Sequence, residues 1–301
     1  MSVYVVTGGE GFIGRNLVSR IRKSGDTAIS VDITGNPDFK VSVADFAGIR
    51  SAFKGCDGVF HLAAITSPPQ FEDDLMGGFL NNVNGTLNVL RAAQENGASR
   101  VVFASSSATY GSLPHVADES MLSYEHENMY PLTKAIGELL GKFFNRRSEI
   151  EFVAMRYFNT YGFGENTKSL YSSVIWKFVE AASRSEDIVI FGDGSQSRDF
   201  VYVGDVAEAT FQAMTRGKPG ESYNVGTGVS TDFNTIAEQV VEISGTSSRI
   251  VHVKNPFRNY QMFTQADISK ISTQLGWKPG TSLREGIALL LDHANEERKR
   301  R

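Results

Sequence analysis

A tyrosine and a lysine four residues apart, Tyr130 and Lys134, are the pair whose types and spacing most clearly predict chemistry. Residues i and i+4 lie on one face of a helix, so both side chains would point the same way. A neighbouring ammonium group favours the phenolate and lowers the phenol pKa from its usual value of about 10. Such a tyrosine can take a proton from a substrate hydroxyl and return it near neutral pH. The alternative is a chance spacing, so the prediction depends on the elements around the pair.

The chain before that helix supplies a third candidate group. Residues 100–104 have the composition of a buried strand, and this strand runs into three consecutive hydroxyls, Ser105, Ser106 and Ser107. We therefore interpret residues 105–134 as one acid–base site, positioned by a strand end and a helix.

A glycine-rich segment near the N-terminus predicts a dinucleotide-binding turn. Residues 3–6 are a short apolar run, and residues 7–14 follow it with glycines at positions 8, 9, 11 and 14. A second strand, residues 27–31, ends at Asp32, which lies 18 residues after Gly14. Glycines permit a pyrophosphate to approach a helix N-terminus closely, and the acid accepts from the ribose hydroxyls. A glycine-rich turn with an unrelated aspartate is the alternative.

Asp32 also favours one dinucleotide over the other. Its carboxylate would repel a 2′-phosphate, and no Arg or Lys follows it before Lys40. The sequence therefore predicts NAD, rather than NADP, as the cofactor.

Strands and helices alternate along the first half of the chain. Helical patterns over 46–53 and 81–96 alternate with strand patterns over 58–64, 100–104 and 151–156. This order predicts an α/β fold with a parallel, doubly wound sheet of the Rossmann type. Ligands bind such sheets at the carboxyl ends of the strands. The glycine turn, Asp32, the small residues Ala63 and Ala64, and the serines all fall at such ends.

Beyond residue 162 the alternation weakens, which predicts a smaller, interleaved C-terminal substrate lobe. Short strands are expected at 188–191, 222–225 and 250–253, and helices at 236–243 and 283–293. We expect residues 1–165 and about 202–227 to form the dinucleotide-binding domain. Residues 166–201 and 228–301 would form the nucleotide-sugar-binding lobe.

Composition limits the class of protein. The chain has 301 residues, is 41% hydrophobic and 21% charged, and carries a net charge of −4. These values are ordinary for a globular protein and argue against a generic nucleic-acid binder. The single cysteine leaves no internal disulfide and fits a reducing compartment, so we expect a cytoplasmic protein. Without metal-ligand spacings, a signal peptide or a membrane-length apolar run in the sequence, we expect no metal and no membrane partner.

Together these motifs resemble the extended short-chain dehydrogenase/reductase superfamily, and within it the nucleotide-sugar epimerase/dehydratase family of the UDP-glucose 4-epimerase type. The resemblance spans nearly the whole chain, through residues 7–14, 61–64, 82–86, 105–111, 130–134, 156–162, 192–205 and 275–279. It implies an NAD-dependent nucleotide-sugar 4-epimerase of the UDP-glucose/UDP-galactose type that acts through a transient 4-keto sugar. It also implies a homodimer through the helices over 81–96 and 130–146, for which Phe143 and Phe144 give weak independent support.

The resemblance implies a role for each matching residue. Tyr130 would be the catalytic base, Lys134 would bind the nicotinamide ribose and lower the Tyr130 pKa, and Ser106 would hydrogen-bond the sugar 4-hydroxyl. The cofactor-binding set would be Gly8, Gly11, Phe12, Ile13, Gly14, Asp32, Ser42, Val43, Leu62, Ala63, Ala64, Tyr130 and Lys134. The substrate-binding set would be Ser106, Ser107, Tyr130, Asn159, Arg198 and Arg258. Guanidinium groups match phosphate oxygens in bidentate geometry, although each arginine could instead form a surface ion pair.

Some positions depart from the family pattern. Ser42 replaces an acidic residue that usually contacts adenine, and Thr109 replaces a valine. Sugar dehydratases carry a carboxylate just after the catalytic hydroxyl, whereas this chain has Ser107 and Ala108. Elimination of water needs an acid and a base besides Tyr130, so a dehydratase is not favoured. Two alternatives stay open: an NAD(P)-dependent nucleotide-sugar ketoreductase or dehydrogenase, and a non-catalytic dinucleotide-binding protein.

Overall fold

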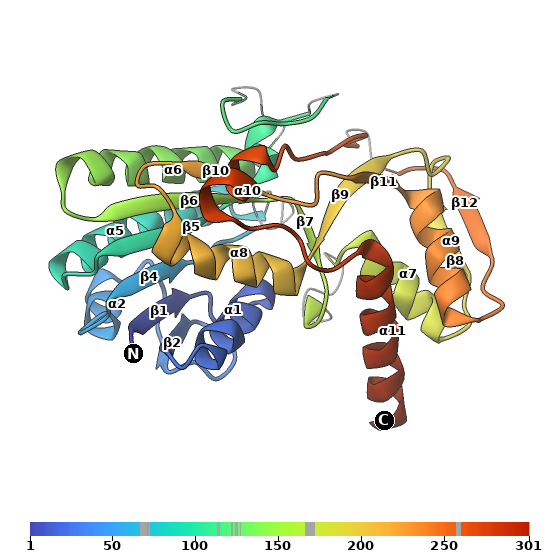
Figure 1. The fold of residues 1–301 in the computed structure, drawn as a ribbon, viewed down its shortest axis with the longest axis horizontal. Helices are drawn as coiled ribbons and strands as arrows, with labels where there is room; N and C mark the ends of the chain where they lie inside the picture. The colour runs from blue at the N-terminus through green and yellow to red at the C-terminus, as the bar shows by residue number, and fades with distance from the viewer. Residues whose placement is uncertain are drawn as a thin grey trace.

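The structure, a computed structural model, describes residues 1–66, 71, 73–112, 115–121, 123, 126, 128–165, 172–256 and 260–300. Arg258, one of the predicted substrate-binding residues, lies outside this set. The described residues form a large sheet with helices on both faces, and a smaller group of strands and helices beside it (Figure 1).

The central sheet has seven strands: β1 (Val3–Thr7), β2 (Thr27–Asp32), β3 (Phe39–Lys40), β4 (Gly58–His61), β5 (Arg100–Ser106), β6 (Glu151–Tyr157) and β10 (Ser222–Val225). Their spatial order is β10-β6-β5-β4-β1-β2-β3, and every neighbouring pair is parallel. The strand order reverses between β1 and β4, which is where doubly wound sheets bind ligands. The predicted fold class is therefore confirmed.

Two layers of helices bury the two faces of this sheet. On one face α1 (Phe12–Lys23), α8 (Val203–Arg216) and α10 (Ser269–Leu275) share a core with strand residues such as Val6 and Phe60. On the other face α2 (Phe46–Ala52), α5 (Gly85–Glu95) and α6 (Met129–Arg147) share a core with Phe103 and Phe152. Burial on both faces explains why the strands read as nearly continuous apolar runs.

Helix α6 is held unusually close to the sheet, and this fixes the position of Tyr130 and Lys134. The Asn128 side chain caps the helix by accepting from the Tyr130 N–H at 3.1 Å. A Cβ on Gly137 would lie 2.5 Å from the Phe103 ring, and a Cβ on Gly141 would lie 2.1 Å from the Phe152 ring. Glycine is therefore required at both positions for the helix to approach β5 and β6.

The predicted helix over 81–96 is interrupted in the structure. Helix α4 (Leu75–Phe79) leads into a π-helical turn, η1 (Leu80–Asn84), and α5 begins only after it. Within this turn the buried Asn82 amide accepts from the Ile65 N–H at 2.8 Å and donates to the Ile65 carbonyl at 2.8 Å. The widened turn thus presents Asn82 to the segment that follows β4, a use of π turns that is common near functional sites.

The later half of the chain builds a second group of elements. A three-stranded sheet contains β11 (Ser230–Asp232), β9 (Ser197–Tyr202) and β7 (Asn159–Tyr161), and a two-stranded sheet pairs β12 (Ile250–Val253) with β8 (Ile188–Phe191). Helices α7 (Val174–Ser183), α9 (Phe233–Ser244) and α11 (Leu283–Arg300) pack around them with a separate core. The short strands and helices expected here are confirmed, and α9 and α11 extend beyond their predicted limits.

The second group of elements has a core separate from those of the central sheet. On this basis we propose that residues 166–201 and 228–301 form a substrate lobe distinct from the dinucleotide-binding domain. Within that proposal α10 is an exception, because Ile271, Leu275 and Trp277 share the core of the central sheet rather than that of the substrate lobe. The chain therefore returns twice to the large sheet after leaving it, through β10 and again through α10, which ties the two groups of elements together.

Candidate active site

The three predicted catalytic side chains come from one strand end and one helix start. Ser106 is the last residue of β5, and Tyr130 and Lys134 lie in the first turns of α6. The Ser106 side chain lies near the Tyr130 phenol and acts to lower its pKa, and the Ser106 hydroxyl oxygen accepts from the Ala108 N–H at 3.1 Å. The structure therefore places a serine beside a tyrosine, the arrangement that acid–base chemistry on a substrate hydroxyl requires.

Lys134 is buried beside this pair. Its Nζ donates to the Ala104 carbonyl at 2.7 Å and lies 5.9 Å from the centre of the Tyr130 ring. Burial lowers the pKa of Lys134 to about 7, and the negative charge of Glu138 acts in the opposite direction. The ammonium is thus within electrostatic reach of the phenol, but its hydrogen bond is to the strand backbone.

The expected lowering of the Tyr130 pKa is not found in this structure. Burial raises the pKa of Tyr130, and the hydrogen bond from Ser106 only partly opposes that rise. The physical reason is desolvation, because an anionic phenolate loses more hydration in this position than one hydrogen bond returns. The spacing of two residues in a sequence does not reveal how deeply they are buried, and the prediction considered only the charge of Lys134.

A cleft of about 630 Å³ opens at the carboxyl ends of β1, β2 and β4, and it reaches Tyr130 and Lys134. Every residue of the predicted cofactor set lines it: Gly8, Gly11, Phe12, Ile13, Gly14, Asp32, Ser42, Val43, Leu62, Ala63, Ala64, Tyr130 and Lys134. The cleft also contains residues that sequence reasoning missed: Glu10, Arg15, Thr34, Thr66, Asn81, Ser105 and Tyr157. Its volume is within the range of ordinary ligand sites.

The glycine turn in this cleft is shaped for a pyrophosphate. Gly8 has φ +71°, and a Cβ there would lie 2.7 Å from the Ala63 nitrogen. A Cβ on Gly14 would lie 2.0 Å from the Gly8 oxygen. Gly11 is the N-cap of α1 and has no side chain to cover the helix N-terminus, where the helix dipole favours an anion. The residues present therefore fit the diphosphate of NAD.

Asp32 stands at the other end of the turn, as the ribose-binding role requires. One carboxylate oxygen accepts from the Ile33 N–H at 2.7 Å and from the Thr34 N–H at 3.1 Å. The other accepts from the Glu10 N–H at 3.0 Å, which anchors the glycine turn to the end of β2. Asp32 is thus fixed in place with an oxygen that has room for one further donor.

A second cavity of about 650 Å³ lies among the elements of the substrate lobe. It is lined by two predicted residues, Asn159 and Arg198, and by a larger set that the sequence did not reveal, including Glu165, Lys177, Phe191, Phe233 and Tyr260. The Asn159 amide donates to the Thr264 hydroxyl at 2.9 Å. Ser107 begins a short 3₁₀ turn, η2 (Ser107–Tyr110), and is half-buried. No short motif connects the missed residues, because they come from five places in the chain: the segment after β7, α7, β8, α9 and the segment after β12.

Arg198 is the most informative residue of this second cavity. Arg198 is 7% exposed, and its guanidinium carbon lies 5.8 Å from the centre of the Phe233 ring and 5.6 Å from that of Tyr260. It donates to the backbone carbonyls of Ser197 and Gln261 and forms no ion pair with any acidic side chain among the described residues. Burial lowers its pKa to about 10. A buried cation that faces a cavity without a counterion is a site for an anion.

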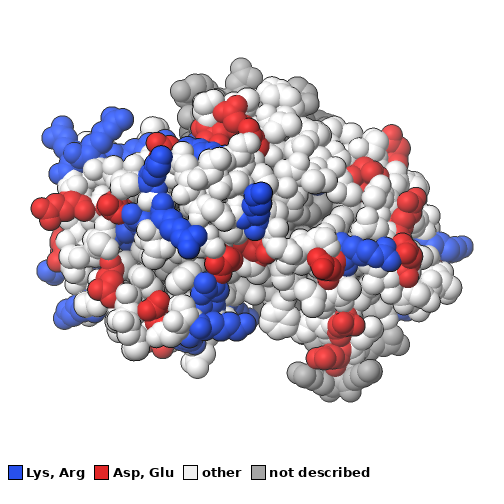
Figure 2. Space-filling view, viewed as in Figure 1, with Lys and Arg blue, Asp and Glu red and all other residues white. Residues whose placement is uncertain are grey.

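The rest of the described surface gives no sign of other chemistry. Among the described residues, no group of three or more His, Cys, Asp or Glu is placed to hold a metal ion. No helix within the described ranges is both long and apolar enough to cross a bilayer. On the face shown in Figure 2, basic and acidic side chains are interspersed. The absence of a nucleic-acid partner stays a prediction.

Comparison with known proteins places this geometry in a family. The model of the NAD-dependent epimerase/dehydratase family matches residues 4–226. A putative UDP-glucose 4-epimerase from Methanocaldococcus jannaschii is 34% identical over 296 residues, covering 94% of this chain and 95% of the relative. A UDP-N-acetyl-alpha-D-glucosaminuronate decarboxylase from Bacillus cytotoxicus is 30% identical over 308 residues, covering 94% of each protein.

A solved structure agrees with these relatives. UDP-glucose 4-epimerase from Thermotoga maritima, determined with UDP-glucose, has a TM-score of 0.89 to this chain at 28% identity, covering 99% of this chain and 100% of the other. The relatives differ in activity, so they establish the family and its cofactor, NAD, rather than one reaction. The chain belongs to the NAD-dependent epimerase/dehydratase family, within the extended short-chain dehydrogenases/reductases.

Proposed function

We propose that this enzyme is a nucleotide-sugar 4-epimerase of the UDP-glucose/UDP-galactose type. The observation that carries the proposal is the grouping of Ser106, Tyr130 and Lys134, with Tyr130 and Lys134 lining the cofactor cleft. The absence of a carboxylate at Ser107 and Ala108 supports a reaction that needs only one acid–base group. The putative epimerase and the UDP-glucose complex among the similar proteins are consistent with it.

In this proposal each side chain has one task. NAD, when bound, supplies reversible oxidation at the sugar C4. Tyr130 takes the proton of the 4-hydroxyl and returns it, and Ser106 orients that hydroxyl toward the phenol. Lys134 is held by the Ala104 carbonyl, and its charge favours the phenolate against the cost of burial. Rotation of the 4-keto sugar between the two steps would invert C4.

The second cavity accounts for the other end of the substrate. We assign Arg198 to the diphosphate because its charge is buried without a counterion and faces that cavity. The rings of Phe191, Phe233 and Tyr260 supply apolar surface for a nucleobase. Asn159 lies at the boundary of the same cavity, and we assign it to the sugar. Arg258 remains a predicted phosphate ligand.

A uronate decarboxylase is a second candidate, because a relative with that activity matches the chain over nearly its whole length. The same oxidation at C4 of a uronate gives a β-keto acid, which loses CO2 readily. The two reactions therefore share Ser106, Tyr130 and Lys134 and differ in the substituent at C5. A ketoreductase or dehydrogenase would use the same residues but exchange its cofactor with solvent.

The deciding experiment uses the purified protein without added cofactor. We would record its absorbance spectrum and then add UDP-, dTDP- and GDP-sugars, including uronates, and identify the products by NMR. Retained NAD with C4-inverted product is the expected result. Loss of CO2 from a uronate alone would replace the proposal with a decarboxylase. Turnover only with added NAD(H) or NADP(H) would favour a ketoreductase or dehydrogenase, and binding without turnover a sensing role.

We also propose a homodimer through the predicted segments 81–96 (η1 and α5) and 130–146 (α6), with α4 beside them. Leu139 and Phe143 of α6 are 61% and 54% exposed, and Leu75 and Met76 of α4 are exposed nearby in the same layer. Phe144 does not belong to this surface, because it packs partly against the core behind the sheet. Phe143→Asp is expected to convert the dimer to a monomer in light scattering, whereas an unchanged mass would contradict the proposed interface. The cytoplasmic location stays a prediction.

A further inference from the structure

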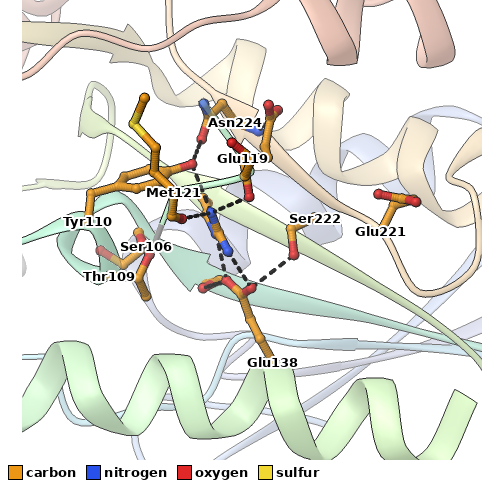
Figure 3. Close-up of polar contacts among 12 residues, drawn as sticks. Ser106, Thr109, Tyr110, Glu119, Met121, Glu138, Glu221, Ser222 and Asn224 are labelled. Carbon is orange, nitrogen blue, oxygen red and sulfur yellow. Dashed lines mark hydrogen bonds and ion pairs between the residues drawn. The ribbon is translucent and has the colours of Figure 1, made fainter. Parts of the chain in front are cut away.

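A buried ion pair lies behind the catalytic residues and has no role in the proposed reaction. Glu138 of α6 and Arg156 of β6 are each 3% exposed. Arg156 donates from Nε and Nη2 to the two carboxylate oxygens, both at 2.9 Å. Figure 3 shows Glu138 pointing from α6 toward the sheet, with Ser222 pointing toward it. Such pairs contribute little net stability compared with apolar residues of similar volume, so stability alone does not explain this one.

The Glu138 carboxylate also accepts from two serine hydroxyls on two strands. Ser105 of β5 donates to one oxygen, and Ser222 of β10 donates to the other at 2.9 Å. Ser105 immediately precedes Ser106, and the residue before it, Ala104, provides the carbonyl that binds Lys134. Through Ser105, Glu138 therefore fixes the end of β5, which carries both Ser106 and the Ala104 carbonyl that binds Lys134.

Arg156 extends the same network to the loop in front of Tyr130. Its Nη1 donates to the Tyr110 hydroxyl at 3.0 Å and to the carbonyls of Glu119 and Met121 at 3.2 Å (Figure 3). The Tyr110 hydroxyl donates in turn to the Asn224 side chain at 2.5 Å. Glu138 holds the guanidinium of Arg156 through Nε and Nη2. The contacts of Arg156 with Glu119 and Met121 therefore depend on the ion pair as well.

The charge of Glu138 has a second consequence, because Glu138 follows Lys134 by four residues on one helix face. The other titratable groups around Lys134 come from α6, β4 and β6: Tyr130, His61 and Arg156. His61 is buried between the hydroxyls of Thr7 and Thr86, and burial lowers its pKa to about 3, so it is neutral. Arg156 is compensated by Glu138 itself. Glu138 is therefore the carboxylate whose charge opposes the desolvation of Lys134.

We propose that Glu138 is a positioning residue for the catalytic pair: it holds the end of β5 through Ser105, and its negative charge, one helical turn away, favours the charged form of Lys134. The effect on turnover rests on the proposed function. The effect on Lys134 does not, because it follows from burial, spacing and charge alone.

Two serines give a matched test of the first half of the proposal. Ser105→Ala and Ser222→Ala each remove one hydroxyl from the same carboxylate, and both serines are 3% exposed. We expect similar losses of thermal stability from the two variants. Ser105→Ala is expected to lower kcat about tenfold with KM for the nucleotide sugar unchanged, the loss of one charge-assisted hydrogen bond. Ser222→Ala is expected to keep kcat within about twofold. Equal kcat values for the two variants would overturn the positioning role.

Glu138→Gln tests the second half of the proposal, with Glu138→Asp as the variant that keeps the charge. The side-chain resonance of Lys134 is followed by NMR in lysine-labelled protein and assigned by its absence in Lys134→Met. We expect the titration midpoint to fall by about one pH unit in Glu138→Gln and to stay near the wild-type value in Glu138→Asp. The pH above which kcat declines should fall in parallel in Glu138→Gln, whereas in Ser105→Ala that pH should stay the same although kcat itself is lower. An unchanged midpoint in Glu138→Gln would overturn the charge role.

These readouts separate the two proposals. A wild-type protein that turns over no nucleotide sugar would contradict the proposed function, and the Lys134 titration would still decide the role of Glu138. Glu138→Gln leaves Arg156 buried without its counterion; should that variant not fold, the serine pair still decides whether the carboxylate positions β5.

Discussion

The cofactor cleft and the substrate cavity are similar in size but are built in different ways. The phosphate-binding end of the cleft is shaped by backbone, namely a glycine turn, the start of a helix and the ends of parallel strands. The cavity is formed by side chains from α7, β8, β9 and α9, with the cation of Arg198 among them. Backbone geometry tolerates few substitutions and serves one ligand, whereas side chains can be exchanged singly. We therefore expect the cofactor cleft to be the more constrained of the two sites, and the substrate cavity to be the site where single substitutions can change substrate specificity.

The largest effect is expected at the point where the cleft and the catalytic residues meet. Tyr130→Phe removes the proton acceptor but keeps the ring, so kcat should fall by about 10²- to 10⁴-fold. NAD retention and thermal stability should change little, because the substitution keeps the ring and Ser106 is the one side chain that offsets burial in setting the phenol pKa. Steady-state kinetics and a thermal melt on the same preparation check both. Unimpaired turnover would contradict the assignment of Tyr130.

A smaller effect, on binding rather than turnover, is expected in the substrate cavity. Arg198→Met should raise KM for the nucleotide sugar roughly 10- to 100-fold through loss of charge-assisted hydrogen bonds to phosphate. The same change should raise the melting temperature, because it removes a buried cation whose pKa is lowered to about 10 by desolvation.

The control for Arg198 is an arginine of the same lobe on the surface. Arg284 is 57% exposed and paired with Glu242 at 2.7 Å, so Arg284→Met should leave KM unchanged and the melting temperature nearly so. Isothermal titration with the nucleoside diphosphate measures the affinity of each variant directly. Equal affinities for the Arg198 and Arg284 variants would exclude Arg198 as the phosphate ligand.

A substitution at Asp32 in the cofactor cleft should weaken ligand binding less than the substitution at Arg198. Asp32→Asn keeps the shape and some hydrogen bonds of the side chain but removes the charge, so NAD affinity should fall about tenfold. The preference for NAD over NADP should narrow because the repulsion of the 2′-phosphate is lost. Competition binding of the two dinucleotides measures this ratio. A ratio that does not change would show that the backbone around Thr34, rather than the charge, excludes the phosphate.

The same contrast explains how much the sequence could predict. The residues predicted to bind the cofactor all line one cleft, because Gly8 to Gly14 and Asp32 are close in sequence and are brought together by one turn. Lys177, Phe233 and Tyr260 were missed, because only the fold brings them together. Arg198 was found through a family motif, but its two flanking rings carry no pattern of their own.

The degree of burial of each side chain could not be predicted from the sequence either. The four-residue spacing placed Tyr130 and Lys134 correctly side by side, but the direction of the Tyr130 pKa shift was wrong, since burial raises this pKa by more than Ser106 lowers it. The Glu138–Arg156 pair was not predicted at all, because it joins a helix and a strand whose contact depends on Gly137 and Gly141. Propensity and periodicity locate elements, whereas the balance of charge and burial follows from their packing.

The last prediction concerns the pH dependence of folding stability, which tests the balance of burial and charge at Lys134. Burial lowers the pKa of Lys134 from its usual 10.5 to about 7 in the folded protein. Between these values the unfolded chain binds the proton and the folded protein does not, so stability should rise with pH, by at most about 1.4 kcal/mol per pH unit.

Lys134→Met should remove this slope, and it should gain stability most at pH values below about 7, where the wild-type ammonium is buried. Lys142→Met, on the same helix, keeps Lys134 and should keep the slope. Urea unfolding of the three proteins between pH 6 and about 9 isolates the contribution as a difference. A wild-type slope that survives in Lys134→Met would mean that the buried ammonium is fully compensated by Glu138 and the Ala104 carbonyl. In that case the electrostatic cost of the catalytic pair lies with Tyr130 alone.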